Sequence, residues 1–572
     1  MGSLASAAVA TGTESRPLRQ DVSRDDIVMR IGLVLLAAWL AVTVLLPIWA
    51  LLSKSFEDKG GGFVGLANFV AFVGNPGLTA SIANSLFIAL LSTAICILLA
   101  FVFAYGLTNT RMPGRQVLRV IAQIPLLAPS LLPAISLVYL FGNQGLAKGL
   151  LFGNSIYGPI GIVMGEVFWT FPQALLILTT ALAVSDGRLY EAAAALRASP
   201  WRTFWTVTLP GARYGLISAT FVVFTLVITD FGVPKVIGGQ FNVLATDVYK
   251  QVVGQQNFQM GAVVGLILVL PAVLAFVVDR IVQRRQVALL SARAVPYEPK
   301  PDTIRDAIFL VLCGLIALAI LTILGVAFFA SIATFWPYNL TPSLKNYDFD
   351  MMDGGGWASY RNSLVMATST AVLGTAIVFS GAYLLEKARG FGRFRSAVQF
   401  LALLPLAVPG LVLGLGYIFF FNAPANPLGF LYGSMGILVI CTIAHFYSVA
   451  HLTAVTALKQ IDPEFETVAA SLRVPFYRTF TRVTLPVCLP AVLDIAMYLF
   501  VNAMTTVSAV VFLYAPKTTL AAIAVLNMDD AGDVAPAAAM AMMIFLTSAL
   551  VRIAYAGLTA SYLRRAQAWR RR

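Results

Sequence analysis

The chain alternates between long apolar runs and short polar segments along its whole length. Each run has about 20 residues, the length that an α-helix needs to cross about 30 Å of hydrocarbon. Because lipid offers backbone groups no hydrogen-bond partners, such runs are expected to be helices rather than open strands. The runs cover 32–52, 82–108, 118–141, 158–184, 215–234, 262–283, 306–333, 362–386, 397–421, 433–457, 490–514 and 535–562. The pattern predicts an all-α polytopic membrane protein with about 12 spans.

Composition agrees with this class. The chain is 59% hydrophobic and 11% charged, whereas soluble domains are about one quarter charged. The first 26 residues are polar, and the first apolar run is longer than the core of a signal peptide. We therefore expect the first run to remain in the protein as a membrane anchor.

The net charge of +13 follows the predicted topology. Thirty of the 39 lysines and arginines lie in alternate polar segments, beginning with the N-terminal tail. Cytoplasmic loops carry such an excess of basic residues, so both termini of this polytopic protein are expected in the cytoplasm. The charge therefore gives no reason to expect nucleic acid as a partner.

The sequence gives little indication of a metal site or of catalytic residues. The four cysteines lie in or beside apolar runs without CxxC spacing, so we expect buried thiols and no disulfide framework. His445 and His451 are six positions apart and therefore lie on different faces of one helix. No metal site and no catalytic residue is predicted.

Two polar segments repeat each other 276 residues apart. The segments are Asp186–Pro210 and Asp462–Pro486, and 12 of their 25 aligned positions are identical. The repeat continues outside them: Asn84-Ser85-Leu86 matches Asn362-Ser363-Leu364. Six spans per copy is an even number, so the two repeats are parallel and the substrate path is expected between them. The predicted parts are a tail (1–29), a first unit (30–283), a cytoplasmic linker (284–305), a second unit (306–563) and a basic tail (564–572).

The repeated segments are each expected to form a short helix. Alanine-rich stretches at 191–195 and 468–471 favour helix. Glu191 and Glu466 stand near the starts of these helices, where the helix dipole favours an anion. The alternative is an amphipathic helix that only packs on the bundle. Because the segment occurs twice at matched positions, we instead expect two docking points for two copies of one soluble partner.

The pattern from Glu191 to Pro210 resembles the EAA loop of permease subunits in bacterial ABC importers. The resemblance implies the type I importer fold, two ATP-binding subunits docked at the loops, and a periplasmic solute-binding protein at the outer face. The sequence has no GxxxxGK[ST] motif, so ATP and Mg are expected on the partner subunits and the chain itself is not expected to be an enzyme. The coupling residues carried over are Glu191, Ala192, Ala193, Arg197, Leu209, Pro210, Glu466, Ala469, Ala470, Arg473, Leu485 and Pro486.

Two departures from the family pattern stand out. The family usually has glycine where this chain has Arg197 and Arg473. A left-handed arginine costs on the order of 1–2 kcal/mol, so the helix break is expected to move to Pro200 and Pro475. In the second copy Glu466 aligns with Tyr190, so the two loops are expected to bind their partners unequally.

The fused pair of units is similar to the ferric-iron, thiamine and phosphonate branch of these importers. Asp230–Lys235, Val243–Lys250 and Leu403–Tyr417 look like permeases assigned to 2-aminoethylphosphonate uptake, and this solute is the predicted substrate, with ferric iron as the alternative. Intramembrane ionisable residues usually face the bundle interior, so Glu166, Asp230 and Lys235 are predicted to line the path. A purely structural role for the two carboxylates remains open.

Two other functions are compatible with many spans. An ion-coupled secondary transporter would need buried carboxylates that couple ion and substrate, but it would not need duplicated docking loops. A membrane enzyme would need a catalytic constellation, and the sequence has neither paired carboxylates, nor HExxH, nor a nucleophile elbow.

Overall fold

The computed structural model describes residues 24–289, 297–388, 391–462 and 464–566. The predicted N-terminal tail up to residue 23, linker residues 290–296 and tail residues 567–572 lie outside this range. The described chain is mostly helical, which confirms the predicted class. Its short hairpin pairs β1 (Ala333–Phe335) with β2 (Asn339–Pro342) in antiparallel register.

The first half begins with a long helix and ends before the linker. Its elements are α1 (Arg24–Leu40), η1 (Ala41–Leu45), α2 (Leu46–Lys54), α3 (Ala67–Val73), α4 (Pro76–Asn109), α5 (Arg115–Gln123), η2 (Ile124–Leu127), α6 (Leu131–Phe141), η3 (Lys148–Leu151), α7 (Pro159–Ala183), α8 (Gly187–Ala195), α9 (Pro200–Thr203), η4 (Phe204–Thr208), α10 (Leu209–Thr229), α11 (Gly232–Ile237), α12 (Leu244–Tyr249), η5 (Lys250–Gly254) and α13 (Phe258–Leu289).

The second half repeats this order. Its elements are α14 (Thr303–Ile332), η6 (Lys345–Tyr347), η7 (Phe349–Met351), α15 (Gly356–Lys387), α16 (Gly392–Leu403), η8 (Leu404–Ala407), α17 (Gly410–Phe421), η9 (Gly429–Leu431), α18 (Met435–Lys459), α19 (Glu464–Ser471), α20 (Phe476–Thr479), η10 (Phe480–Thr484), α21 (Leu485–Val487), α22 (Leu489–Thr505), η11 (Pro516–Thr518), α23 (Ala521–Ala531) and α24 (Val534–Ala566).

The spans agree with the hydrophobic pattern in number. Nine helices of the described chain are long and apolar enough to cross a membrane, and three sharply bent pairs raise the number to as many as twelve. The expected third and ninth spans are two of these pairs, bent by 103° and 114°. Pro125 and Pro129, like Pro405 and Pro409, flank the bends. Proline lacks the N–H that a continuous helix needs, which accounts for the bends in these spans.

Two expected spans are shorter than the apolar runs that predicted them. The fifth run extends to residue 234, but α10 ends at Thr229. The eleventh extends to residue 514, but α22 ends at Thr505, and its helix pair is bent by 76°. In both halves the remaining apolar residues form buried turns and short helices. Burial inside the protein, and not lipid, therefore explains their hydrophobicity.

The first helix of each half packs on the other half. α1 contacts α15 and α16, while α14 contacts α4, α5 and α6. Glycines permit the close approach: a Cβ on Gly32 would meet Leu384 Cδ1 at 2.9 Å, and one on Gly106 would meet Cys313 Sγ at 2.8 Å. Small residues at helix contacts are the usual means of packing in membranes. The two sequence units are thus interlocked in space.

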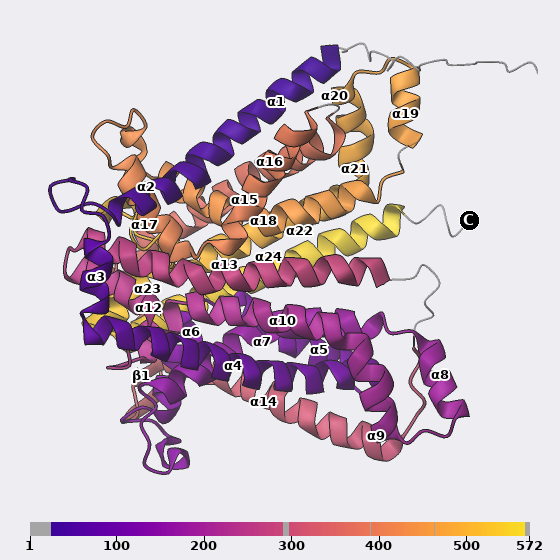
Figure 1. The fold of residues 1–572 in the computed structure, drawn as a ribbon. Helices are drawn as coiled ribbons and strands as arrows, with labels where there is room; N and C mark the ends of the chain where they lie inside the picture. The colour runs from indigo at the N-terminus through magenta and orange to yellow at the C-terminus, as the bar shows by residue number, and fades with distance from the viewer. Residues whose placement is uncertain (1–23, 290–296, 389–390, 463, 567–572) are drawn as a thin grey trace, which may run out of the picture.

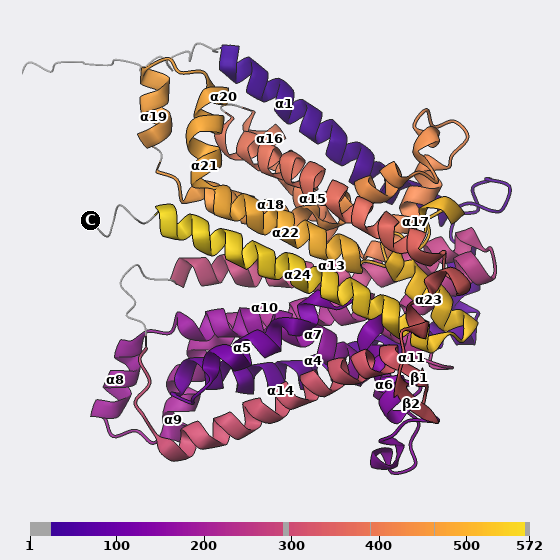
Figure 2. The same cartoon turned by 180° about the vertical axis from the view of Figure 1, so that it is seen from behind.

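The two ends of the molecule differ. At one end α8 and α19 lie far apart, each at the tip of its own half, in both views (Figures 1 and 2). At the other end elements of both halves gather, among them α2, α17, α12 and α23. α2 packs on α17 and α13 also packs on α17, so contacts between halves are extensive there. Elements of both halves therefore gather at one end, whereas α8 and α19 stand apart at the other.

Candidate functional site

The first predicted coupling loop carries a two-turn helix, α8, as its alanines predict. Asp186 caps this helix, because its Oδ1 accepts a hydrogen bond from the Arg188 N–H at 3.1 Å. Ala193 faces the bundle and is buried, whereas Glu191 and Ala192 are exposed. The Glu191 carboxylate and its neighbouring alanine are therefore available on the outer face of the helix.

The second loop carries α19 at the matched place. Asp462 Oδ1 accepts from the Glu464 N–H at 2.9 Å, which repeats the cap of the first loop. Ala469 is half-buried; the side chain of Ala470 lies outside the described structure. Glu466 points toward the bundle, where its Oε1 lies 2.6 Å from Lys387 Nζ. The exposed carboxylate at the start of this helix is therefore Glu464, which the sequence analysis did not single out.

Different chemistry anchors the two coupling helices at equivalent positions. In the first half the Tyr190 hydroxyl donates to Thr208 Oγ1 at 3.0 Å and accepts from Asn109 Nδ2 at 3.4 Å. The Tyr190 ring also stacks on Tyr297, with centroids 3.9 Å apart. In the second half these contacts give way to the Lys387–Glu466 ion pair. The two loops therefore differ in their attachment to the bundle. Unequal binding of their partners stays a prediction.

The prediction for the helix break was wrong. Arg197 and Arg473 both adopt the left-handed conformation, with φ of 52° and 51°. After Arg197, the Ala198 N–H reaches the Ala193 carbonyl at 2.9 Å, and the Arg197 N–H reaches the Ala194 carbonyl at 3.0 Å. These two bonds form the Schellman motif, which satisfies carbonyls at the helix end and so offsets the strain. Arginine thus occupies the left-handed position after the helix that glycine usually takes.

The last residues of both repeated segments lie within helices. Leu209 and Pro210 form the first turn of α10, which continues α9 and η4 without a break from Pro200 to Thr229. Leu485 and Pro486 begin α21, but this helix stops at Val487 and α22 leaves at an angle. The second half has Pro490 near this bend, whereas the matched residue of the first half is Tyr214. The extra proline is consistent with the bend.

Exposed apolar side chains also recur on the two loops at matched positions. Leu196 is 82% exposed and its partner Leu472 is 69% exposed. The other matched pairs are Leu189 with Phe465 and Trp201 with Tyr477. In the second loop, part of this set lines a hollow of about 560 Å³ with Arg478 and Arg482. Sequence analysis missed this surface, although Leu196 and Leu472 were among the identical positions. Recurrent exposed apolar groups are typical of a protein-docking surface.

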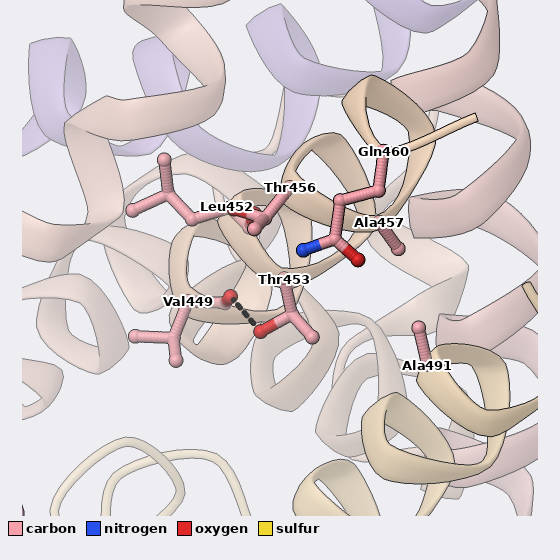
Figure 3. A pocket seen from close by; sticks show the side chains of 7 residues that line it. All are labelled: Val449, Leu452, Thr453, Thr456, Ala457, Gln460 and Ala491. Carbon is pink, nitrogen blue, oxygen red and sulfur yellow. Dashed lines mark hydrogen bonds between the residues drawn. The ribbon is translucent and has the colours of Figure 1, made fainter. Parts of the chain in front are cut away.

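A second hollow lies where α18 approaches the second coupling loop. Its volume is about 440 Å³. Figure 3 shows its lining, in which Thr453 Oγ1 donates to the Val449 carbonyl at 3.0 Å. The remaining lining residues are Leu452, Thr456, Ala457, Gln460 and Ala491, none of them ionisable. This hollow is therefore neutral and does not contain any predicted path residue.

The three predicted path residues gather around α11, at the end opposite the coupling helices. Glu166, on α7, is completely buried, and neither of its carboxyl oxygens has a hydrogen-bond donor in the described chain. The Asp230 carboxyl faces it. Asp230 Oδ2 also accepts from the Val233 N–H at 2.9 Å, which makes Asp230 a cap of α11. Lys235, on α11, is ion-paired with Asp530 of the second half at 2.9 Å.

This geometry gives each of the three residues a structural contact. Asp230 stabilises the start of a short helix, and Lys235 connects the halves. Glu166 contacts the Asp230 carboxyl, and its match on α18 is Thr442, whose hydroxyl bonds the Leu438 carbonyl. Whether any of them touches solute stays a prediction.

The chain is similar to known transport proteins over both halves. The family described as binding-protein-dependent transport system inner membrane component matches residues 97–287 and 381–563. A ferric transport system permease protein of Actinobacillus pleuropneumoniae is 27% identical over 81% of this chain and 69% of its own length. A Haemophilus influenzae permease named for ferric transport is 27% identical over 77% of this chain and 70% of its own.

Other relatives match a smaller part of the chain. A Salmonella typhi permease named for 2-aminoethylphosphonate transport is 24% identical over 40% of this chain and 82% of its own length. A solved alginate ABC transporter, in complex with an alginate-bound periplasmic protein, covers 49% of this chain and 100% of its own, at 17% identity and a TM-score of 0.40. The match of the family to both halves shows that the chain belongs to the binding-protein-dependent transport system inner membrane components, the membrane permeases of bacterial ABC importers.

Proposed function

We propose that this permease delivers a small solute across the inner membrane with energy from two ATP-binding subunits, one docked on α8 and one on α19. The observation that carries the proposal is the pair of matched coupling helices. Both stand at the tips of the two halves with exposed carboxylates and apolar side chains. A partner that contacts Leu196 and Leu472 would remove these side chains from water, which favours association.

Mechanism follows from the separation of the two coupling helices. ATP-driven closure of a subunit pair would draw α8 and α19 together. Because the halves are joined at the opposite end, this movement would rock them and open that end. The arrangement seen in Figure 1 then corresponds to the state that faces the coupling helices. A periplasmic binding protein would deliver solute at the opposite end.

Ferric iron is the substrate that the relatives favour. Both relatives named for ferric transport align with most of this chain, through both halves. The relative named for 2-aminoethylphosphonate spans only 40% of it. The short stretches that resemble phosphonate permeases therefore count for less, and ferric iron replaces 2-aminoethylphosphonate as the proposed substrate. The carboxylates Asp529 and Asp530 at the solute-entry end are of the ligand type that hard cations prefer.

Radioactive iron uptake tests the substrate. A strain that lacks the chain is complemented with the intact protein or with a Leu196→Asp/Leu472→Asp variant, and ferric uptake and growth at limiting iron are measured. We expect uptake only with the intact protein. Growth on 2-aminoethylphosphonate as sole phosphorus source serves as the second assay. If that growth depends on the chain and iron uptake does not, the phosphonate assignment is correct.

ATP hydrolysis separates this importer from an ion-coupled transporter. The chain is purified with and without its co-expressed ATP-binding subunits, and hydrolysis and uptake are measured in proteoliposomes. Uptake that requires the subunits and ATP supports the proposal. Uptake driven by an ion gradient with the chain alone contradicts it.

A further inference from the structure

An ion pair joins the halves at the solute-entry end. Lys235 Nζ, on α11 of the first half, lies 2.9 Å from Asp530 Oδ1, near the end of α23 of the second half. The Lys235 side chain is 22% exposed and that of Asp530 is 46% exposed. The two residues are 295 positions apart in the sequence. Their pairing therefore depends entirely on how the halves are placed.

An aromatic ring lies beside the lysine of this ion pair. Lys235 Nζ lies 5.3 Å from the centre of the Tyr249 ring, within the range of a cation–π contact. Tyr249 in turn stacks on Phe512 of the second half, with centroids 6.1 Å apart and an interplanar angle of 24°. Lys235 and Tyr249 thus contact residues of the second half from two adjacent helices, α11 and α12. A movement that parted the halves here would break both contacts at once.

The position of Lys235 is fixed from within the first half. α11 has only six residues, so it depends on its surroundings for order. Asp230 caps its first turn, and Gly232 lies directly against Ser130, where any Cβ would collide with the Ser130 hydroxyl. The Lys235 ammonium is consequently presented to the second half from a rigid base.

The second half has no equivalent of this ion pair. Hydrogen bonds from Leu244 N–H to Ser85 Oγ and from Ala521 N–H to Ser363 Oγ place α12 and α23 in register. In this register the match of Asp530 is Val253, and the match of Lys235 is Phe512. The symmetry-related positions are therefore uncharged, so symmetry of the fold does not explain the Lys235–Asp530 contact.

We propose that Lys235 and Asp530 form a clasp that holds the solute-entry end shut until ATP closure or a docked binding protein opens it. The inference rests on the proposed function, since it assigns a task to one contact of that transport cycle. A partly exposed ion pair contributes modestly, so its loss should change the ratio of closed to open states about two- to fivefold. A change of this size alters the basal rate of ATP hydrolysis of a transporter that alternates between the two states.

The test uses the full complex with its ATP-binding subunits in lipid nanodiscs, without binding protein or solute. Basal ATP hydrolysis is measured for Lys235→Ala, Asp530→Ala and the charge exchange Lys235→Asp/Asp530→Lys. We expect each alanine variant to raise basal hydrolysis about two- to fivefold, because opening of the end becomes easier. The charge exchange should return the rate toward that of the unaltered protein. Such rescue would not follow from a general loss of packing.

Lys250→Ala is the matched control. Lys250 lies at the same end, but it bonds Asn242 of its own half, so its loss should leave basal hydrolysis unchanged. Unchanged rates in both single alanine variants, or failure of the charge exchange to restore the rate, would overturn the clasp. A complex that hydrolyses no ATP in any form contradicts the proposed function instead, so the two failures are distinguishable.

Discussion

Glu466 forms an ion pair with Lys387 at 2.6 Å, at the position where the first half places Tyr190 against Asn109. The glutamate of the second coupling helix therefore attaches that helix to the bundle. In the first half this attachment uses hydroxyl and amide groups, and Glu191 stays exposed. One helix is thus held by charge and the other by neutral hydrogen bonds.

Salt should affect the two coupling helices differently. Both side chains of the Lys387–Glu466 pair are partly exposed, at 16% and 32%, and such pairs are screened by ions. We expect Glu466→Gln or Lys387→Gln to lower coupled uptake about two- to fivefold, which is the range of a pair worth up to about 1 kcal/mol. The exchange Glu466→Lys/Lys387→Glu should restore uptake at low salt. Asn109→Ala, the control in the first half, should give a loss that does not vary with salt.

Docking should depend on the matched leucines. Leu196→Asp removes an exposed apolar side chain from α8 and adds charge, and Leu472→Asp does the same beside α19. We expect each single variant to reduce co-purification of the ATP-binding subunits and the double variant to abolish it, because burial of a leucine contributes about 1.5–3 kcal/mol. Thr206→Ala, an exposed position on the same segment, is the control. Full recovery of the subunits with the double variant would contradict docking at these loops.

Replacing a left-handed arginine, Arg197 or Arg473, with glycine should make the protein more stable. Because a left-handed conformation costs a side-chain-bearing residue about 1–2 kcal/mol, Arg197→Gly should raise stability by up to about 1 kcal/mol while docking persists. Arg197→Val should lower it, since branching at Cβ adds to the strain. Arg202→Gly, inside α9, should be destabilising by about 1 kcal/mol. Thermal inactivation of the assembled complex provides the measurement, and an equal loss in Arg197→Gly and Arg202→Gly would argue against the left-handed role.

The buried carboxyl pair should matter to transport more than to ATP hydrolysis. We expect Glu166→Gln and Asp230→Asn to impair uptake without lowering subunit-driven hydrolysis, because both lie at the end opposite the coupling helices. Asp230→Asn retains an oxygen that can cap α11, so protein yield should remain close to normal. Both rates are measured on the same proteoliposomes. Normal uptake in both variants would remove these residues from the solute path and leave them a structural role.

The closed state of the solute-entry end should become more favoured over the open state as the pH falls. Burial, together with the neighbouring Asp530 carboxylate, raises the pKa of Asp529 to about 6, while Lys235 lowers it. Tyr139 and Tyr157 of the first half also face this carboxyl. A raised pKa means that the packed arrangement favours the protonated acid, so its contribution is complete below about pH 4 and is lost as the pH rises through about 6.

Basal hydrolysis measured between pH 7.5 and pH 5.5 checks this dependence. Relative to Asp529→Asn, which cannot titrate, the unaltered complex should slow further as the pH is lowered, by up to a few fold. The ratio of the two proteins cancels the pH response of the ATP-binding subunits. Parallel profiles would show that Asp529 does not contribute to closure.

The amino-acid sequence alone determined the number of spans, the duplication and the place of the coupling helices. These features depend on local composition: about 20 apolar residues predict a span, and an alanine-rich segment between two spans predicts a short helix. The bends at Pro125, Pro129, Pro405 and Pro409 also depend on local sequence, because proline removes a backbone N–H wherever it occurs.

Only the tertiary structure decided which residues meet across the sequence. The left-handed Arg197 and Arg473 depend on carbonyls satisfied at the end of a folded helix, and this compensation outweighs the intrinsic strain that propensity measures. The exchange of α1 and α14 between halves, and the contact of Lys235 with Asp530, join segments hundreds of residues apart. Hydrophobic periodicity reports that a helix has a buried face, but it does not report which partner covers that face.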